Sequence, residues 1–242
     1  MKRNRLSSFE LPPKSDTTYL YYTYYFKDLK EIFDSYIRKG NRVLDIGCGN
    51  KPFENYIRGL TEEESKDSYI GCDLEQSSEE KVDILCDATN IPLSTAFDVV
   101  ICTQLIEHVF DHQKVFEEAY RILNPGGFFI VSSNFLWETH EAPYDFYRFT
   151  RFAFQKLLEK TGFEVIEGRA NGGKWATIGQ FLSIAGHIAH RPTDPLLLRA
   201  LRTAFRKTFH WTCNSLFFYL DKKHYNPDRY TMNYIFVGKK QK

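Results

Sequence analysis

Short apolar segments with β-branched residues alternate along the chain with longer segments whose apolar residues recur every three or four positions. The first pattern is typical of strands buried on both faces of a parallel sheet, and the second of amphipathic helices. Five segments fit the strand pattern, namely 42–46, 68–74, 82–87, 97–102 and 128–132, and four fit the helix pattern, namely 19–39, 52–60, 111–123 and 152–160. This alternation predicts an α/β fold with a doubly wound, mostly parallel sheet.

The last third of the chain departs from this alternation. Strands are predicted at 162–167 and, antiparallel to the others, at 231–237, which brings the sheet to seven strands. A helical insertion is expected at about 170–230 between them. We expect residues 1–18 to form an N-terminal arm and residues 19–242 to form a single domain that includes the insertion.

One helix of the insertion has an apolar face and a basic face. The apolar residues are Leu198, Leu201, Phe205, Thr208 and Phe209, and the basic residues are Arg199, Arg202 and Arg206. A basic amphipathic helix suits the surface of an anionic membrane. A lid packed over the sheet and a homodimer contact are the alternatives.

A glycine turn follows the predicted strand at 42–46, in the run Asp45-Ile-Gly-Cys-Gly49. Gly47 and Gly49 can adopt positive φ and carry no side chain, so backbone N–H groups can approach a ligand closely. A helix that begins near Asn50 would direct its positive end to the same place and favour a carboxylate or a phosphate. A tight turn without any ligand explains a lone Gly-x-Gly equally well.

Polar residues also follow the neighbouring strands. Asp73 ends the second strand, Asp87-Ala88 the third, and Thr103-Gln104 the fourth. Ligands of doubly wound sheets bind beyond the carboxyl ends of the strands, so we expect these segments to converge on one crevice. Taken singly, each acid is equally well explained as a helix cap or a strand-end turn.

Together these segments resemble the class I S-adenosylmethionine-dependent methyltransferases, in particular the type 11 group. The resemblance covers about residues 40–135 and rests on 43–49, Asp73, Asp87-Ala88, 97–109 and 123–131. It implies a Rossmann-like methyltransferase fold and S-adenosyl-L-methionine as the cofactor. The cofactor-binding residues that it implies are Asp45, Gly47, Cys48, Gly49, Asp73, Leu74, Asp87, Ala88, Thr103 and Gln104.

The chemistry of these residues agrees with the resemblance. The Asp73 carboxylate can accept hydrogen bonds from both hydroxyls of a ribose. Asp45 would repel a pyrophosphate but suits the ammonium group of a methionine moiety. A dinucleotide-binding turn requires a third glycine at position 52, which is Pro52 in this chain.

Methyl transfer is an in-line displacement that depends mainly on alignment, and a general base assists when the acceptor is a hydroxyl. His140 and His108 are the candidate bases, although His108 could instead brace the turn after the fourth strand. Tyr147 could stack on a sugar and Arg148 could hold an anionic group. The alternative is a structural loop in which Asp145 and Arg148 pair. The segment 140–150 resembles one in type 11 members encoded with bacterial surface-glycan enzymes.

Composition narrows the choice of partner and compartment. The net charge is +1, which does not favour nucleic acid as a partner, but from Arg191 onward eleven Lys and Arg residues stand against three acids. The five cysteines contain no Cys-x-x-Cys pair, which fits a reduced, cytoplasmic protein. No acidic metal cluster of the catechol-enzyme type is evident, and we predict no metal.

The predicted function is therefore S-adenosylmethionine-dependent methylation, at oxygen, of a small-molecule or carbohydrate-like acceptor. We expect a cytoplasmic transferase, with the inner face of the membrane as a second location if the basic helix contacts lipid. One alternative is an RNA or protein methyltransferase that docks through the basic C-terminal region. Another is a non-catalytic module that keeps the fold as a binding scaffold.

Overall fold

The computed structural model of the chain describes residues 8–63, 65–94, 97–187, 195–227 and 229–241. Residues 1–7 of the predicted arm and 188–194 of the predicted insertion lie outside the described residues. The described residues form two compact units. The first is built from Phe9, 29–169 and 234–241, and the second from 10–28 and 170–233.

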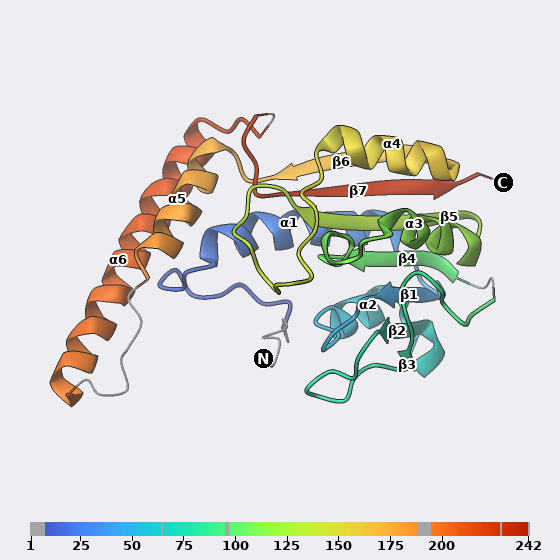
Figure 1. Ribbon diagram of the computed structural model, residues 1–242, viewed down its shortest axis with the longest axis horizontal. Helices are drawn as coiled ribbons and strands as arrows, with labels where there is room; N and C mark the ends of the chain where they lie inside the picture. The colour runs from blue at the N-terminus through green and yellow to red at the C-terminus, as the bar shows by residue number, and fades with distance from the viewer. Residues whose placement is uncertain (1–7, 64, 95–96, 188–194, 228, 242) are drawn as a thin grey trace. The chain divides into compact units, whose positions relative to one another are not determined.

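A seven-stranded sheet runs through the first unit in the order β3-β2-β1-β4-β5-β7-β6 (Figure 1). Its strands are β1 (Val43–Ile46), β2 (Tyr69–Asp73), β3 (Ile84–Leu85), β4 (Phe97–Thr103), β5 (Leu123–Asn134), β6 (Phe163–Asn171) and β7 (Asn233–Lys240). The first five are parallel, and β7 is antiparallel to them. The predicted α/β fold class, with its mostly parallel sheet and antiparallel last strand, is confirmed.

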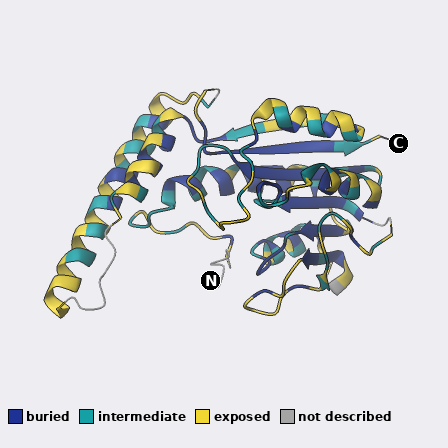
Figure 2. Ribbon diagram, viewed as in Figure 1, coloured by how far each residue is buried: buried dark blue, intermediate teal, exposed yellow. Residues whose placement is uncertain are grey.

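Strand β1 pairs in register along its whole length with its two neighbours, β2 and β4. Val43 of β1 pairs with Tyr69 of β2 and Val99 of β4, and Ile46 pairs with Cys72 and Cys102. All four residues of β1 are buried, as are most of those in β4 (Figure 2). Each fully buried Val, Leu or Ile side chain contributes about 1.5–3 kcal/mol, so this register is strongly determined.

Four helices accompany the strands: α1 (Tyr19–Tyr36), α2 (Glu54–Thr61), α3 (His112–Ile122) and α4 (Arg151–Thr161). Helix α2 packs on β2, and α3 packs on β5 and α4. The Thr150 hydroxyl caps α4 by accepting from the Ala153 N–H, and Gly162 ends it in the left-handed region at φ 102°.

Three element boundaries differ from the prediction in ways that affect the site. Helix α2 begins at Glu54, so no helix starts near Asn50 as expected. Strand β3 covers only Ile84–Leu85, because the Asp83 carboxylate turns back to accept from the Gly71 N–H at 2.7 Å. Strand β5 begins at Leu123 and not at 128 as predicted, and its pairing with β4 shifts register between Phe97 and Val99.

The second unit is helical. Helices α5 (Lys174–Ala185) and α6 (Leu196–Lys223) pack against each other. The Asn214 amide of α6 donates to the backbone carbonyls of Lys14 and Asp16 at 2.7 and 2.8 Å. Within the described residues, no helix is both long and apolar enough to cross a membrane.

Candidate functional site

A cavity of about 210 Å³ lies at the carboxyl ends of β1 and β2. It is formed by five segments that are distant in sequence, which is the convergence expected of a doubly wound sheet. Its lining residues are Ile46, Gly47, Cys72, Asp73, Leu74, Glu75, Cys86, Asp87, Ala88, Leu105, His108, Val109 and Tyr144.

The glycine turn after β1 forms one wall of this cavity. Gly47 and Gly49 have φ values of 75° and 51°, a region that strains other residues. A Cβ on Gly47 would lie 2.9 Å from the Leu105 side chain. The structure differs from the prediction in one respect: the N–H groups of Gly47 and Cys48 donate to the Cys72 carbonyl, at 2.8 and 3.1 Å, instead of facing a ligand.

Asp73 is held in a fixed orientation at the end of β2. Its Oδ2 accepts from the Gly49 N–H at 3.1 Å, and its side chain borders the cavity although the residue is only 8% exposed. The carboxylate is therefore positioned before any ligand arrives, and Leu74 beside it is exposed along the same wall.

Asp87 and Ala88 form another part of the wall. One carboxylate oxygen of Asp87 accepts from both the backbone N–H and the hydroxyl of Thr89 at 2.8 Å. This oxygen therefore caps the turn after the strand, which is the alternative given for Asp87 from the sequence. Asp87 borders the cavity as well.

Five predicted cofactor residues are absent from the cavity lining and lie in the framework around it. Asp45 is 1% exposed, and its Oδ2 accepts from the Tyr69 hydroxyl at 2.5 Å. Cys48 is buried, which raises the pKa of its thiol. Gly49 orients Asp73, and the Gln104 amide donates to the Ser132 hydroxyl at 3.0 Å. Thr103, which pairs with Ser132 at the end of β4, lies outside the lining too.

Of the predicted catalytic residues, His108 reaches the cavity. It ends a short helical turn, η2 (Ile106–His108), and its Nδ1 lies 2.7 Å from the Tyr144 carbonyl. Because a carbonyl can only accept, Nδ1 carries the proton and Nε2 presents a lone pair. Burial, and the positive charge of His140 when protonated, lower the pKa of His108. His108 is therefore neutral at physiological pH.

The loop at 140–150 is braced from within. The Arg148 guanidinium donates to both oxygens of Asp145, at 2.6 and 2.8 Å, which lowers the pKa of Asp145 to about 2. Asp145 also accepts from the His140 N–H at 2.9 Å. The Tyr147 hydroxyl donates to the Phe110 carbonyl at 3.0 Å. The Asp145–Arg148 pair of the structural alternative is thus present, and His140, Tyr147 and Arg148 lie outside the cavity lining.

Sequence reasoning gave no role to Glu107 or Tyr144. Glu107 is fully buried behind His108; its Oε1 is 3.4 Å from the Asn134 amide, and its Oε2 has no hydrogen-bond partner. Burial raises the pKa of Glu107 to about 7. The Glu107-His108 pair was visible in the sequence, but no periodic or local signal brings Tyr144 beside it.

Glu107, His108 and His140 each offer one ligand atom, and these atoms lie within 4.8 Å of one another. The His108 and His140 rings are 4.7 Å apart, edge to face. A carboxylate with two imidazoles is a ligand set that suits a divalent transition metal. The same groups suit proton transfer, and the absence of a metal stays a prediction.

A family model described as a methyltransferase domain matches residues 19–168. The chain belongs to the methyltransferase domain family. The matched range includes every cavity-lining residue, which confirms the predicted family at the level of methyltransferases. The likeness to the type 11 group and to surface-glycan enzymes stays a prediction.

Curated relatives match part of the chain. A probable S-adenosylmethionine-dependent methyltransferase of Mycolicibacterium smegmatis is 32% identical over 141 residues, which cover 52% of this chain and 53% of the relative. A ubiquinone biosynthesis O-methyltransferase of Coxiella burnetii is 27% identical over 118 residues, covering 44% and 50%. The matches therefore span about half the length of these relatives.

Among solved structures, the [4+2]-cyclase SpnF superposes with a TM-score of 0.57 at 18% identity, covering 89% of this chain and 82% of that one. At this identity the likeness concerns the fold alone.

Burial of Glu107 predicts a pH-dependent stability. Its pKa is about 7 in the folded protein, against about 4.5 when unfolded. Between these values the folded state binds the extra proton, so stability falls as pH rises through this window. Glu107→Gln should remove this loss of stability. The free energy of unfolding of the variant minus that of wild type should therefore be roughly 2–3 kcal/mol larger at about pH 8 than at about pH 5.5.

Urea unfolding at the two pH values measures this difference. Exposed Glu117→Gln is the matched control and should retain the wild-type pH dependence. An unchanged pH dependence in Glu107→Gln would show that Glu107 is ionised in the folded protein at neutral pH.

Proposed function

We propose that the chain transfers a methyl group from S-adenosyl-L-methionine to a hydroxyl oxygen of a small, ring-bearing acceptor. The observation that carries the proposal is the fixed Asp73 carboxylate, held by the Gly49 N–H at the edge of a cavity that Asp87 and Ala88 also border. Membership of the methyltransferase domain family supports it. S-adenosyl-L-methionine, when bound, supplies a methyl group on a positively charged sulfur.

Each cavity residue has a defined task in this proposal. Asp73 accepts hydrogen bonds from the ribose hydroxyls, and its fixed orientation reduces the entropy lost on binding. The Asp87 carboxylate accepts from the adenine amino group while the Ala88 N–H donates to a ring nitrogen. Gly47 leaves room for the cofactor, because a side chain there would already touch Leu105.

His108 is the general base of the proposed reaction. Its Nδ1 donates to the Tyr144 carbonyl, so the Nε2 lone pair is available to take a proton from the acceptor hydroxyl. His108 is favoured over His140 because His108 borders the cavity. His140 lies outside the cavity lining, next to Asp145. His140 then acts as a positioning residue that packs against the edge of the His108 ring.

The acceptor is a phenol or a carbohydrate-like molecule. Tyr144, which borders the cavity, is 54% exposed, and Phe146 on the same loop is 41% exposed. Such rings provide flat apolar surfaces for another ring. A relative that carries the name of a ubiquinone biosynthesis O-methyltransferase supports a phenolic hydroxyl, and the segment 140–150 supports a glycan.

The first half of α6 is proposed to contact an anionic membrane. Leu196, Leu197, Leu201 and Phe205 are all more than half exposed, and Arg199 and Lys207 are exposed on the same helix. Apolar side chains beside cations suit the interface of an anionic bilayer. A lid and a homodimer contact remain the alternative roles of this helix.

Calorimetric titration with S-adenosyl-L-methionine tests the cofactor assignment. We expect a Kd in the micromolar range, about −8 kcal/mol, and a loss of roughly tenfold to a hundredfold in Asp73→Ala, because hydrogen bonds to a charged group are lost. Asp67→Ala, a change of an exposed aspartate outside the cavity, should bind like wild type. No binding to folded wild-type protein would favour the scaffold alternative.

The release of S-adenosylhomocysteine with catechol as acceptor tests the base. His108→Ala should lower kcat by about 10²- to 10⁴-fold. Because the pKa of His108 is lowered, wild-type activity should persist below about pH 6.5 before it declines. A normal rate in His108→Ala contradicts the assignment, and a rate abolished by a chelator would give Glu107, His108 and His140 a metal-binding role.

Co-sedimentation with phosphatidylglycerol vesicles tests the membrane contact. Leu201→Glu should lower the bound fraction, because it places a negative charge among the apolar residues at the start of α6. Leu216→Glu is the matched control, an exposed leucine in the second half of the same helix. Equal binding of both variants, or no binding of wild type, would leave the lid and the dimer contact as the explanations.

A further inference from the structure

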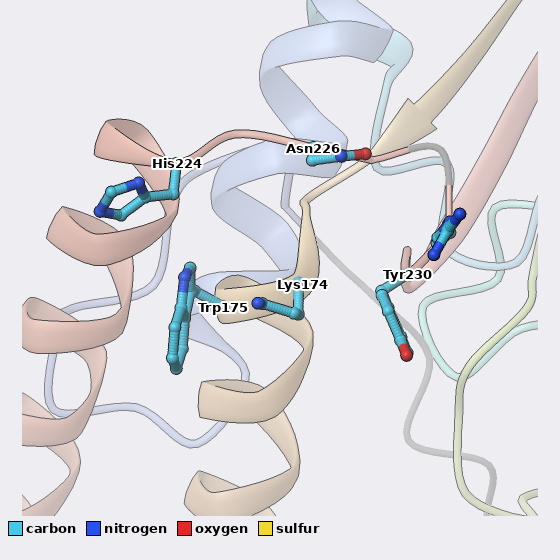
Figure 3. A pocket seen from close by; sticks show the side chains of 6 residues that line it. Lys174, Trp175, His224, Asn226 and Tyr230 are labelled. Carbon is cyan, nitrogen blue, oxygen red and sulfur yellow. The ribbon is translucent and has the colours of Figure 1, made fainter.

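The second unit has a cavity of its own, of about 560 Å³, which plays no part in the proposed methyl transfer. The first turn of α5 contributes Lys174 and Trp175, and the segment that joins α6 to β7 contributes the rest. The lining residues are Lys174, Trp175, His224, Asn226, Arg229 and Tyr230 (Figure 3).

The charged groups of this lining are all cationic or able to become so. Lys174 and Arg229 carry a positive charge, and His224 gains one on protonation. None of the described residues of the lining is a carboxylate. Among the described residues, none of these three side chains forms an ion pair with an acid. The cavity therefore favours an anionic ligand.

Three backbone amides at the start of α5 are already occupied. Asp221, a buried residue near the end of α6, accepts from the N–H groups of Gly173, Trp175 and Ala176, each at 3.0 Å. Its charge offsets the positive end of α5. The charged side chains that remain in the lining to bind an anion include Lys174 and Arg229.

The wall between the two segments is close-packed. A Cβ on Gly173 would lie 2.8 Å from the Asp221 carboxylate and 3.1 Å from the Asn226 backbone nitrogen. Glycine at this position lets the loop after α6 approach the first turn of α5. The cavity is thus formed by contacts within one unit and does not depend on the methyltransferase cavity.

Size and aromatic content indicate a ligand larger than a simple anion. Small-molecule sites usually measure about 300–1,000 Å³, and an inorganic phosphate would fill little of this one. The Lys174 side chain points toward Trp175 (Figure 3), with its Nζ 4.7 Å from the centre of the indole ring, and Tyr230 borders the same cavity. Aromatic rings beside a cation can pack against an organic ring that bears an anionic group.

We propose that this cavity binds a phosphorylated sugar. Lys174 and Arg229 bind the phosphate, the latter through its planar fork of N–H donors, and the Tyr230 and Trp175 rings pack against the sugar. The sugar phosphate is either a soluble metabolite or the headgroup of a phosphoinositide, since both present the same chemistry.

Calorimetric titration of the full chain with glucose 1-phosphate, with unphosphorylated glucose as comparison, tests the soluble form. Flotation with vesicles that contain phosphatidylinositol phosphate, against phosphatidylcholine alone, tests the headgroup. In whichever arm binding occurs, Lys174→Ala and Arg229→Ala should each weaken it about tenfold, and raised salt should weaken it further. Lys222→Ala, an exposed lysine outside the lining, is the matched control.

The proposal is supported if glucose 1-phosphate binds, or if only the phosphoinositide vesicles bind, and if both cavity variants weaken that binding. The arm in which binding occurs identifies the source of the sugar phosphate. Absence of binding in both arms overturns the proposal. So does binding that Lys174→Ala and Arg229→Ala leave unchanged, or that Lys222→Ala weakens equally. Circular dichroism of each variant confirms that the helices remain folded. Asp73→Ala changes the methyltransferase cavity and leaves the second cavity intact. A failure of sugar-phosphate binding can therefore be distinguished from a failure of the methyl-transfer proposal.

Discussion

The arrangement of the site depends on the hydrogen bonds between the glycine turn after β1 and the end of β2. Gly47 and Cys48 donate to the Cys72 carbonyl, and Gly49 donates to the Asp73 carboxylate. These bonds join two neighbouring parallel strands at their carboxyl ends, and they require positive φ at both glycines. The turn amides therefore hold the acid that faces the cavity, and the acid, in our proposal, holds the cofactor.

Behind this wall, two carboxyl groups are buried at a cost to stability. Burial raises the pKa of both Asp45 and Glu107 to about 7, and one oxygen of each has no hydrogen-bond partner. Burying polar groups without partners is unfavourable, and proteins concentrate such groups at functional sites. Asp45 lies beside the glycine turn and Glu107 beside His108, so both lie next to the residues on which the proposed reaction depends.

The two units serve different purposes in this account. The first contains the sheet, the cavity at the carboxyl ends of β1 and β2, His108 and His140, and almost all of the family match. The second contains two long helices with exposed apolar and basic residues and a cavity whose charged side chains are cationic or able to become so. Methyltransferase-like folds support many reactions, so the choice of acceptor depends on the residues that border the site and not on the fold.

The sequence by itself determined the α/β class, the seven-stranded sheet with its antiparallel last strand and the methyltransferase family, because these follow from hydrophobic periodicity and short motifs at strand ends. It also predicted that Asp73, Asp87 and His108 lie near one another, as they do along the cavity, since parallel strands bring their carboxyl ends to one edge. Only the tertiary structure decided that the turn amides bond to Cys72, that Asp145 binds Arg148, and that Tyr144 lies beside His108. Lys174 and Arg229 likewise line one cavity only after folding. Those contacts join residues without a shared periodicity, and loop geometry and packing determine them.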